Sequence, residues 1–102
     1  MTLEQLIKDL EEAPLYRRVP LGFSSPHSYR GYYTDLAFEP QEDTTVGQML
    51  VCAKSALGQT YHGWKGGEYT MEEHTDVWLA EYGCSGETLG PVLLGYMLGR
   101  YE

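Results

Sequence analysis

Two stretches of the chain carry apolar residues at helical spacing. In the first stretch the apolar residues occur at positions i, i+3, i+4 and i+7, which lie on one face of a helix. These residues are Leu3, Leu6, Ile7 and Leu10. Thr2 and Gln5 have the spacing of a capping box, in which each side chain bonds the backbone of the other residue. Pro14 ends the pattern, because a proline pushes the preceding residue out of the helical region. The pattern predicts an amphipathic helix over residues 2–12.

The second stretch, residues 44–57, is the clearest helical pattern. Its apolar residues repeat at positions i, i+3, i+4, i+7 and i+11: Val46, Met49, Leu50, Ala53 and Leu57. Thr45 and Gln48 again suit a capping box, and Gly58 stands where many helices end in a left-handed residue. Gly47 weakens the first turn by about 1 kcal/mol relative to alanine. We therefore expect Gly47 to allow close packing of another segment.

Alternating side chains predict strands in the second half of the chain. Residues 76–82 place mainly apolar side chains on both faces, which is typical of a central strand covered on two sides. Trp78 and Tyr82 of this strand are expected in the core. Residues 60–64 and 68–71 predict a hairpin that turns around Lys65-Gly66-Gly67. Residues 91–98 fit a buried strand or a helix that begins at Pro91, and we favour the helix.

The remaining segments carry weaker patterns. Residues 15–28 are divided by Pro20 and Pro26 and are expected to be extended chain and loop. Residues 31–39 alternate imperfectly, which fits a strand or a short helical turn. Residues 40–43 are interpreted as an acidic connector, and residues 83–86 as a turn.

These elements together predict an α+β fold. The expected arrangement is a small, mostly antiparallel sheet packed by one central helix, residues 44–57, plus the N-terminal amphipathic helix. The 102 residues are expected to form a single domain, with residues 1–13 as the N-terminal helix and residues 15–102 as the α+β core. Apolar surface left over from the first helix and the tail favours a homo-oligomer.

The net charge of the chain argues against some classes of binding partner. The formal net charge is −8 at pH 7. A protein that binds duplex DNA needs a basic face to neutralise phosphates, so duplex nucleic acid is not an expected partner. A local group of cations can still bind an anionic small molecule. The sequence has neither a signal-peptide pattern nor a run of about 20 apolar residues, which predicts a cytoplasmic protein without membrane contact.

Aromatic, cationic and glycine residues gather in two islands, residues 24–33 and 64–69. Tyrosine gives a rigid, half-apolar contact at low entropy cost. Arginine gives a fixed fork of donors that fits phosphate or carboxylate. We therefore expect the two islands to build one ligand site, and its candidate residues are Tyr29, Arg30, Tyr32, Tyr33, Trp64 and Lys65.

Signals for catalysis or metal binding are weaker. None of the three histidines forms an H-x-x-x-H pair, and a zinc site of His62, His74 and Cys84 would depend on spatial proximity alone. Cys84 lies between a predicted strand and a predicted helix, where a nucleophilic thiol can sit, although a simple turn cysteine explains it as well. Residues 63–67 are too short for a P-loop. We expect no catalytic residue, no metal and no cofactor.

Several segments resemble a group of short, uncharacterised proteins of tailed bacteriophages. The likeness covers residues 20–85 and is carried by Ser28-Tyr29-Arg30-Gly31-Tyr32-Tyr33, Leu36-Ala37-Phe38-Glu39-Pro40, Thr45-Val46-Gly47, Lys65-Gly66-Gly67 and Trp78-Leu79-Ala80-Glu81-Tyr82-Gly83. The resemblance implies no activity. It implies a context, namely a small acidic protein made in the cytoplasm of an infected bacterium. Such proteins are often counter-defence factors that bind host enzymes or sequester cyclic-nucleotide immune signals.

The residues and the resemblance favour a binding protein without catalysis. We expect an anionic, nucleotide-like ligand, with Arg30 and Lys65 on its phosphates and Tyr29, Tyr32 or Trp64 stacked on its base. The alternative is an acidic inhibitor of a host enzyme or of a nucleic-acid-binding protein, because tyrosine, tryptophan and arginine also dominate protein interfaces. A small hydrolase that uses Cys84 or a carboxylate pair is the third hypothesis.

Overall fold

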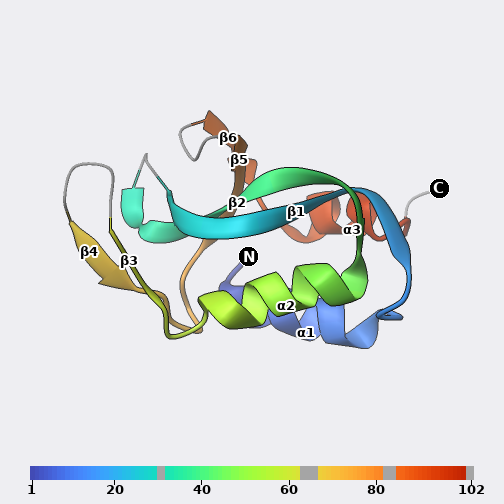
Figure 1. The fold of residues 1–102 in the computed structure, drawn as a ribbon, viewed down its shortest axis with the longest axis horizontal. Helices are drawn as coiled ribbons and strands as arrows, with labels where there is room; N and C mark the ends of the chain where they lie inside the picture. Colours follow the sequence, from blue (N-terminus) through green and yellow to red (C-terminus); the bar gives the residue numbers. More distant parts are fainter. Residues whose placement is uncertain (30–31, 63–66, 82–84, 101–102) are drawn as a thin grey trace.

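The computed structural model describes residues 1–29, 32–62, 67–81 and 85–100, and over these residues the chain forms three helices and six strands (Figure 1). In chain order the elements are α1 (Leu3–Glu12), β1 (Arg18–Tyr29), β2 (Tyr32–Thr45), α2 (Val46–Ala56), β3 (Thr60–His62), β4 (Glu68–Thr70), β5 (Val77–Glu81), β6 (Ser85–Thr88) and α3 (Pro91–Met97). None of the helices in this described part is long and apolar enough to cross a bilayer.

The main sheet has the strand order β1-β2-β5-β6 among the described residues. The pairs β1–β2 and β5–β6 are antiparallel, whereas β2 and β5 run parallel, with Ala37 opposite Trp78. Strands β3 and β4 form a separate hairpin in which Tyr61 lies opposite Tyr69. The predicted α+β class and the mostly antiparallel sheet are therefore confirmed, as are the antiparallel pairing of the two hairpin strands, the internal position of β5 and the helix that begins at Pro91. Lys65 and Gly66 of the predicted hairpin turn lie outside the described residues.

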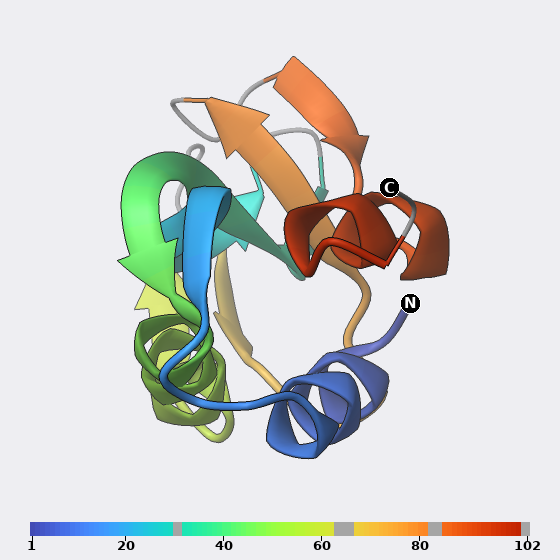
Figure 2. The same cartoon turned by 90° about the vertical axis from the view of Figure 1, so that its right-hand side faces the viewer.

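The expectation that one central helix packs on the sheet is not confirmed. Helices α1 and α2 contact each other and lie side by side beneath the sheet, while α3 lies apart from them, below β6 (Figure 2). Helix α1 is held there by its first residues, because Leu3 N donates to Thr75 O at 2.8 Å and Thr2 forms a β-bridge with Asp76. These bonds join α1 to the segment that leads into β5. The apolar stripe of α1 is consequently covered within the chain.

One cluster of buried residues joins the sheet to all three helices. Phe23 of β1 and Phe38 of β2 are fully buried, and their ring centroids lie 4.4 Å apart at an interplanar angle of 44°. Each helix contributes further buried side chains: Leu3, Leu6 and Leu10 from α1; Val46, Met49, Leu50, Ala53 and Ala56 from α2; Leu94 from α3. The core is thus enclosed between the concave sheet and the helices.

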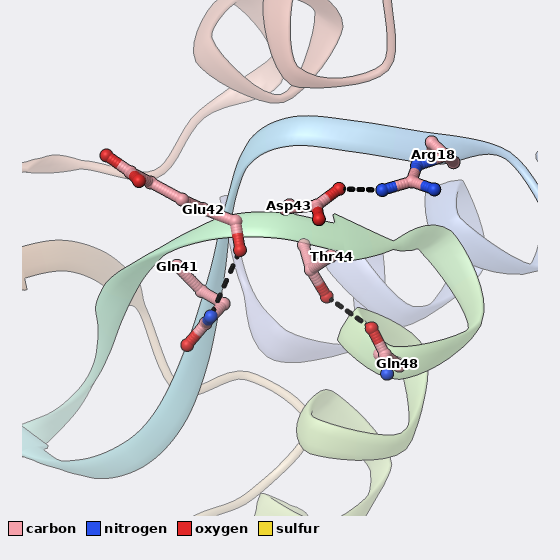
Figure 3. Close-up of polar contacts among 6 residues, drawn as sticks. All are labelled: Arg18, Gln41, Glu42, Asp43, Thr44 and Gln48. Carbon is pink, nitrogen blue, oxygen red and sulfur yellow. Dashed lines mark hydrogen bonds and ion pairs between the residues drawn. The ribbon is translucent and has the colours of Figure 1, made fainter.

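The two predicted capping boxes form to different extents. At α1 the box is complete: Gln5 N donates to Thr2 Oγ1 at 3.3 Å, and Thr2 N donates to Gln5 Oε1 at 2.9 Å. At α2 only half of it forms, because Gln48 N donates to Thr45 Oγ1 at 3.2 Å but Gln48 Oε1 accepts from Thr44 Oγ1 instead (Figure 3). Both helix starts were nevertheless predictable from local sequence.

Strands β1 and β2 form a longer antiparallel ribbon than the sequence predicted. Residues 40–43 are not a connector, since Gln41 and Glu42 pair with Gly22 and Leu21 of β1. The proline and the acidic side chains are tolerated because the described pairing of β2 with β5 ends at Phe38, so that β2 has β1 as its neighbour beyond this point. The alternative of a helical turn over residues 31–39 is likewise wrong for residues 32–39, which belong to β2, and Gly31 lies outside the described residues.

Strand β1 occupies residues that were expected to be extended chain and loop. Its two prolines are compatible with pairing because β1 is an edge strand of the sheet. Ser25 has φ = 50° within an irregularity of the ladder between Ser24 and His27. The predicted turn over residues 83–86 is wrong for its last two residues, because β6 begins at Ser85; its first two lie outside the described residues.

Two glycines allow close approach of α2 and the ribbon. At Gly47 an added Cβ would lie 3.1 Å from Leu15 O, and Gly47 N donates to the same oxygen at 2.9 Å. This confirms the close packing expected at Gly47. At Gly22 an added Cβ would lie 2.6 Å from both Met49 Sδ and Thr44 Cγ2. Gly22 therefore lets α2 pack directly against β1.

We expect Gly22→Ala to lower the free energy of unfolding by about 1–3 kcal/mol, the usual range for overpacking a filled core. Gly90→Ala is the matched control, because an added Cβ there meets nothing within 4 Å and the backbone φ is −118°. Gly90 is the N-cap of α3, where glycine is preferred to alanine, so the control should lower stability by about 0.5–1 kcal/mol and by less than Gly22→Ala. Urea denaturation of both variants measures the difference, and equal midpoints for the two variants would contradict this packing.

Candidate functional site

The structure describes the surroundings of only part of the predicted ligand site. Tyr29 is the last residue of β1 and is half-buried. Tyr32 and Tyr33 begin β2, but their side chains lie outside the described residues. The other three predicted site residues lie outside the described residues altogether: Arg30, Trp64 and Lys65.

Tyr29 stacks on Trp78, which the sequence analysis had assigned to the core. The two ring centroids are 4.4 Å apart and the interplanar angle is 6°, so the rings lie parallel. Trp78 is half-buried rather than enclosed, and its Nε1 donates to Asp35 Oδ2 at 3.0 Å. Parallel stacking is one of the arrangements that aromatic pairs favour, and the bond to Asp35 fixes the indole orientation. The result is a rigid aromatic surface that remains partly accessible.

The sheet brings these residues together from three strands. Tyr29 ends β1, Asp35 lies on β2, and Trp78 lies on β5, next to β2 in the sheet. Large side chains on one face of a sheet can meet over the strand between them. Leu79, the next residue along β5, points to the opposite face, because consecutive strand residues alternate. Local periodicity could not predict the stack, since it depends on strand order.

The described part of the second island contacts the strands that carry the first. The hairpin of β3 and β4 touches β1 and β2 and lies beside their ends at one end of the molecule (Figure 1). Thr60 Oγ1 and Thr70 Oγ1 are hydrogen-bonded at 2.7 Å, and His62 Nδ1 lies 3.4 Å from Glu68 Oε1. Tyr61 packs on the core, and its burial, with a smaller contribution from Cys52, raises the pKa of its phenol. The fold thus brings the hairpin strands beside the second island into contact with the two strands that carry the first.

A second feature is a hollow of about 810 Å³ between α2 and the β1–β2 ribbon, which the sequence analysis missed. The amides of the first turn of α2 lie along it, but they already have acceptors: Val46 N bonds Arg17 O, and Gly47 N bonds Leu15 O. Arg18 pairs with Asp43 at its rim, and this contact raises the pKa of Arg18 (Figure 3). These first-turn amides of α2 are therefore not free to bind a phosphate group, and the Arg18 charge is already paired with a carboxylate.

The residues considered for catalysis or metal binding lie only partly within the described chain. Among the described residues no group of three or more His, Cys, Asp or Glu side chains is placed to hold a metal ion. His74 Nε2 lies 3.3 Å from Glu72 Oε2 at the surface. Cys52 is half-buried against the core, whereas Cys84 and Tyr82 lie outside the described residues.

Comparison of the chain with protein-family models, with curated proteins and with solved structures found no match.

Proposed function

We propose that this protein binds an anionic, nucleotide-like small molecule without catalysis, at the end of the sheet that carries Tyr29 and Trp78. The supporting observation is the parallel, half-buried stack of these two rings, with the indole fixed by Asp35. A nucleobase can extend such a stack, and stacking of a base on an aromatic side chain contributes about 1–3 kcal/mol. A stack that exists before binding also lowers the entropy cost of ordering the site.

The chain around the stack supplies the groups that an anionic ligand needs. Arg30 follows Tyr29 directly, and we assign its guanidinium to a phosphate group. Lys65 stands between the two strands of the hairpin, whose described residues contact β1 and β2. We assign Lys65 to a second phosphate contact, and Tyr32, Tyr33 and Trp64 to further contacts with the base or sugar.

The biological role proposed with this chemistry is counter-defence during bacteriophage infection. The resemblance to short phage proteins supports this context, in which the protein would sequester a cyclic-nucleotide immune signal in the host cytoplasm. The net charge of −8 is compatible with this role only if cations are concentrated at the site. Arg30 and Lys65 are two of the 7 basic residues, so the proposal depends strongly on them.

Titration calorimetry against cyclic dinucleotides and cyclic ADP-ribose isomers tests the proposal. We expect at least one compound to bind, and Tyr29→Ala to weaken that binding by about tenfold or more because one stacking surface is lost. Tyr29→Phe should retain binding, since the ring remains. The matched control is Tyr16→Ala, because Tyr16 is 86% exposed and lies away from the stack. Circular dichroism of each variant checks that the fold persists.

A second pair of variants tests the phosphate contact separately. Arg30→Ala should weaken binding of the same compound and reduce its dependence on salt, while Arg17→Ala, an exposed arginine before β1, should change neither. The proposal fails if the folded protein binds none of the compounds, or if Tyr29→Ala and Tyr16→Ala bind equally well.

The alternative function, an acidic inhibitor of a host protein, is supported by a different surface of the molecule. This surface is the apolar hollow beside α3, for which we propose a partner of defined chemistry below. The expected homo-oligomer remains a prediction, and native mass spectrometry measures it.

A further inference from the structure

An apolar groove of about 450 Å³ lies between α3 and the β1–β2–β5 part of the sheet. Its walls include Leu21, Leu79, Leu93 and Met97, and Glu87 is the one charged residue among those that line it. Leu79 faces away from the Tyr29–Trp78 stack, since it follows Trp78 along β5. The groove is therefore a separate surface from the proposed nucleotide site.

Large apolar side chains stand exposed around this groove. Leu21 is 66% exposed and Tyr96 is 64% exposed, and both line it; Val92, on the adjoining surface of α3, is 62% exposed. A cluster of exposed apolar residues at one concave surface is typical of a protein-binding site.

The charges at the groove point to a cationic partner. Glu42 lies directly opposite Leu21 in the β1–β2 ladder, so the two side chains share a face of the ribbon. The Glu42 carboxylate extends away from Arg18, which is already paired with Asp43 (Figure 3). Within the described residues neither Glu42 nor Glu87 forms an ion pair. The groove thus has apolar walls with one carboxylate, Glu87, in its lining and a second, Glu42, beside its wall residue Leu21, and neither has a cationic partner among the described residues.

We propose that this groove binds an amphipathic helical segment of another protein, with its apolar side chains between α3 and the sheet and with lysine or arginine beside Glu42 and Glu87. Helix-in-groove binding uses apolar anchors at i, i+3, i+4 and i+7, and flanking charges select the partner. A second copy of this chain fits less well. It would bring the carboxylates of two copies together, each copy carrying a net charge of −8.

The probe for this proposal is a fluorescently labelled synthetic peptide with leucine at i, i+3, i+4 and i+7 and lysine at the flanking positions. Fluorescence anisotropy should show saturable binding that weakens as salt rises. Leu21→Glu should weaken it by about tenfold or more, because an apolar contact becomes a buried charge. Val51→Glu is the matched control, since Val51 is 68% exposed and lies on α2, and it should bind the peptide like the wild type.

Two further comparisons test the charge argument and the identity of the occupant. The same peptide with glutamate in place of lysine should not bind, and Glu42→Lys with Glu87→Lys should reduce binding of the lysine peptide. The proposal is overturned if the glutamate peptide binds equally well, if Leu21→Glu and Val51→Glu weaken binding equally, or if the lysine peptide does not bind. A homodimer that Leu21→Glu dissociates would also overturn it, because the occupant would be a second copy.

Separate variants distinguish peptide binding at the groove from nucleotide binding at the Tyr29–Trp78 stack. Leu21→Glu should leave nucleotide titrations unchanged, and Tyr29→Ala should leave peptide binding unchanged. If circular dichroism shows that the Leu21→Glu variant is unfolded, Leu21→Ser provides a smaller change at the same exposed position. Leu21→Ser is also expected to weaken peptide binding.

Discussion

Replacing Phe38 with alanine is expected to lower the free energy of unfolding by about 3–5 kcal/mol, the usual range for truncating a buried phenylalanine. Phe38 is fully buried at the centre of the β1–β2–β5 sheet, and its ring contacts that of Phe23. Alanine would leave a cavity that the sheet and helices could fill only in part. Because domains of this size are stable by about 5–15 kcal/mol, the variant would be close to unfolding at room temperature.

Urea denaturation followed by circular dichroism measures this effect. Phe38→Leu should cost less than the alanine variant, because most of the side-chain volume remains. Tyr16→Ala, which changes an aromatic residue that is 86% exposed, should alter stability by less than about 0.5 kcal/mol. A Phe38→Ala variant as stable as Tyr16→Ala would show that this ring is not packed in the core.

Leu6→Ala in α1 is expected to lower the free energy of unfolding by about 2–5 kcal/mol. Leu6 is fully buried together with Leu3 and Leu10, in the same cluster as the sheet. The result tests whether α1 is part of the core rather than an appendage. The same urea experiment measures it.

Lys8→Ala is the control for the same helix. Lys8 is exposed and its Nζ lies 3.4 Å from Glu4 Oε1, a surface pair of a kind that contributes about 0.3–0.5 kcal/mol. A loss of less than 1 kcal/mol for Leu6→Ala, similar to that for Lys8→Ala, would mean that α1 does not pack against the sheet as described.

The helices and the central strand could be predicted because their signals are local. Thr2 and Gln5 define the start of α1 within four residues, and Pro91 defines the start of α3. Gly58 has φ = 80° after α2, the left-handed conformation expected there. The alternation of side chains around Trp78 correctly predicted an internal strand of the sheet. In each case the information lies within one or two turns of a helix or within one strand.

The arrangement of these elements could not be predicted because it depends on contacts between distant residues. The pairing of Leu21 with Glu42 turns an acidic segment into strand, although its composition is typical of a loop. Helix α1 is placed by bonds from Leu3 to Thr75, far along the chain. No short window of sequence contains either contact.

The same limitation applies to the candidate site. Tyr29 was identified from its neighbours in the chain, but its stacking partner Trp78 was assigned to the core, because alternation alone does not show which face of a strand stays accessible. The groove beside α3 was missed for a related reason. Leu21 and Tyr96 are residue types that are common in protein cores. Only the arrangement of the sheet and α3 shows that both side chains are exposed.

The protein therefore carries two candidate binding surfaces of different chemistry. The Tyr29–Trp78 stack is aromatic and adjoins Arg30 in the sequence, whereas the groove is apolar and bordered by carboxylates. A nucleotide-like anion suits the first surface and would be repelled by the second. A basic amphipathic helix suits the second.

Native mass spectrometry of the purified protein, incubated with the cyclic nucleotide panel, is the most direct test of the proposed function. We predict a stable increase in mass equal to one of these compounds per site. Arg30→Ala and Tyr29→Ala should lose this increase, whereas Arg17→Ala and Leu21→Glu should keep it. A folded wild-type protein whose mass remains that of the polypeptide with every compound would contradict the proposal that this fold presents a nucleotide site.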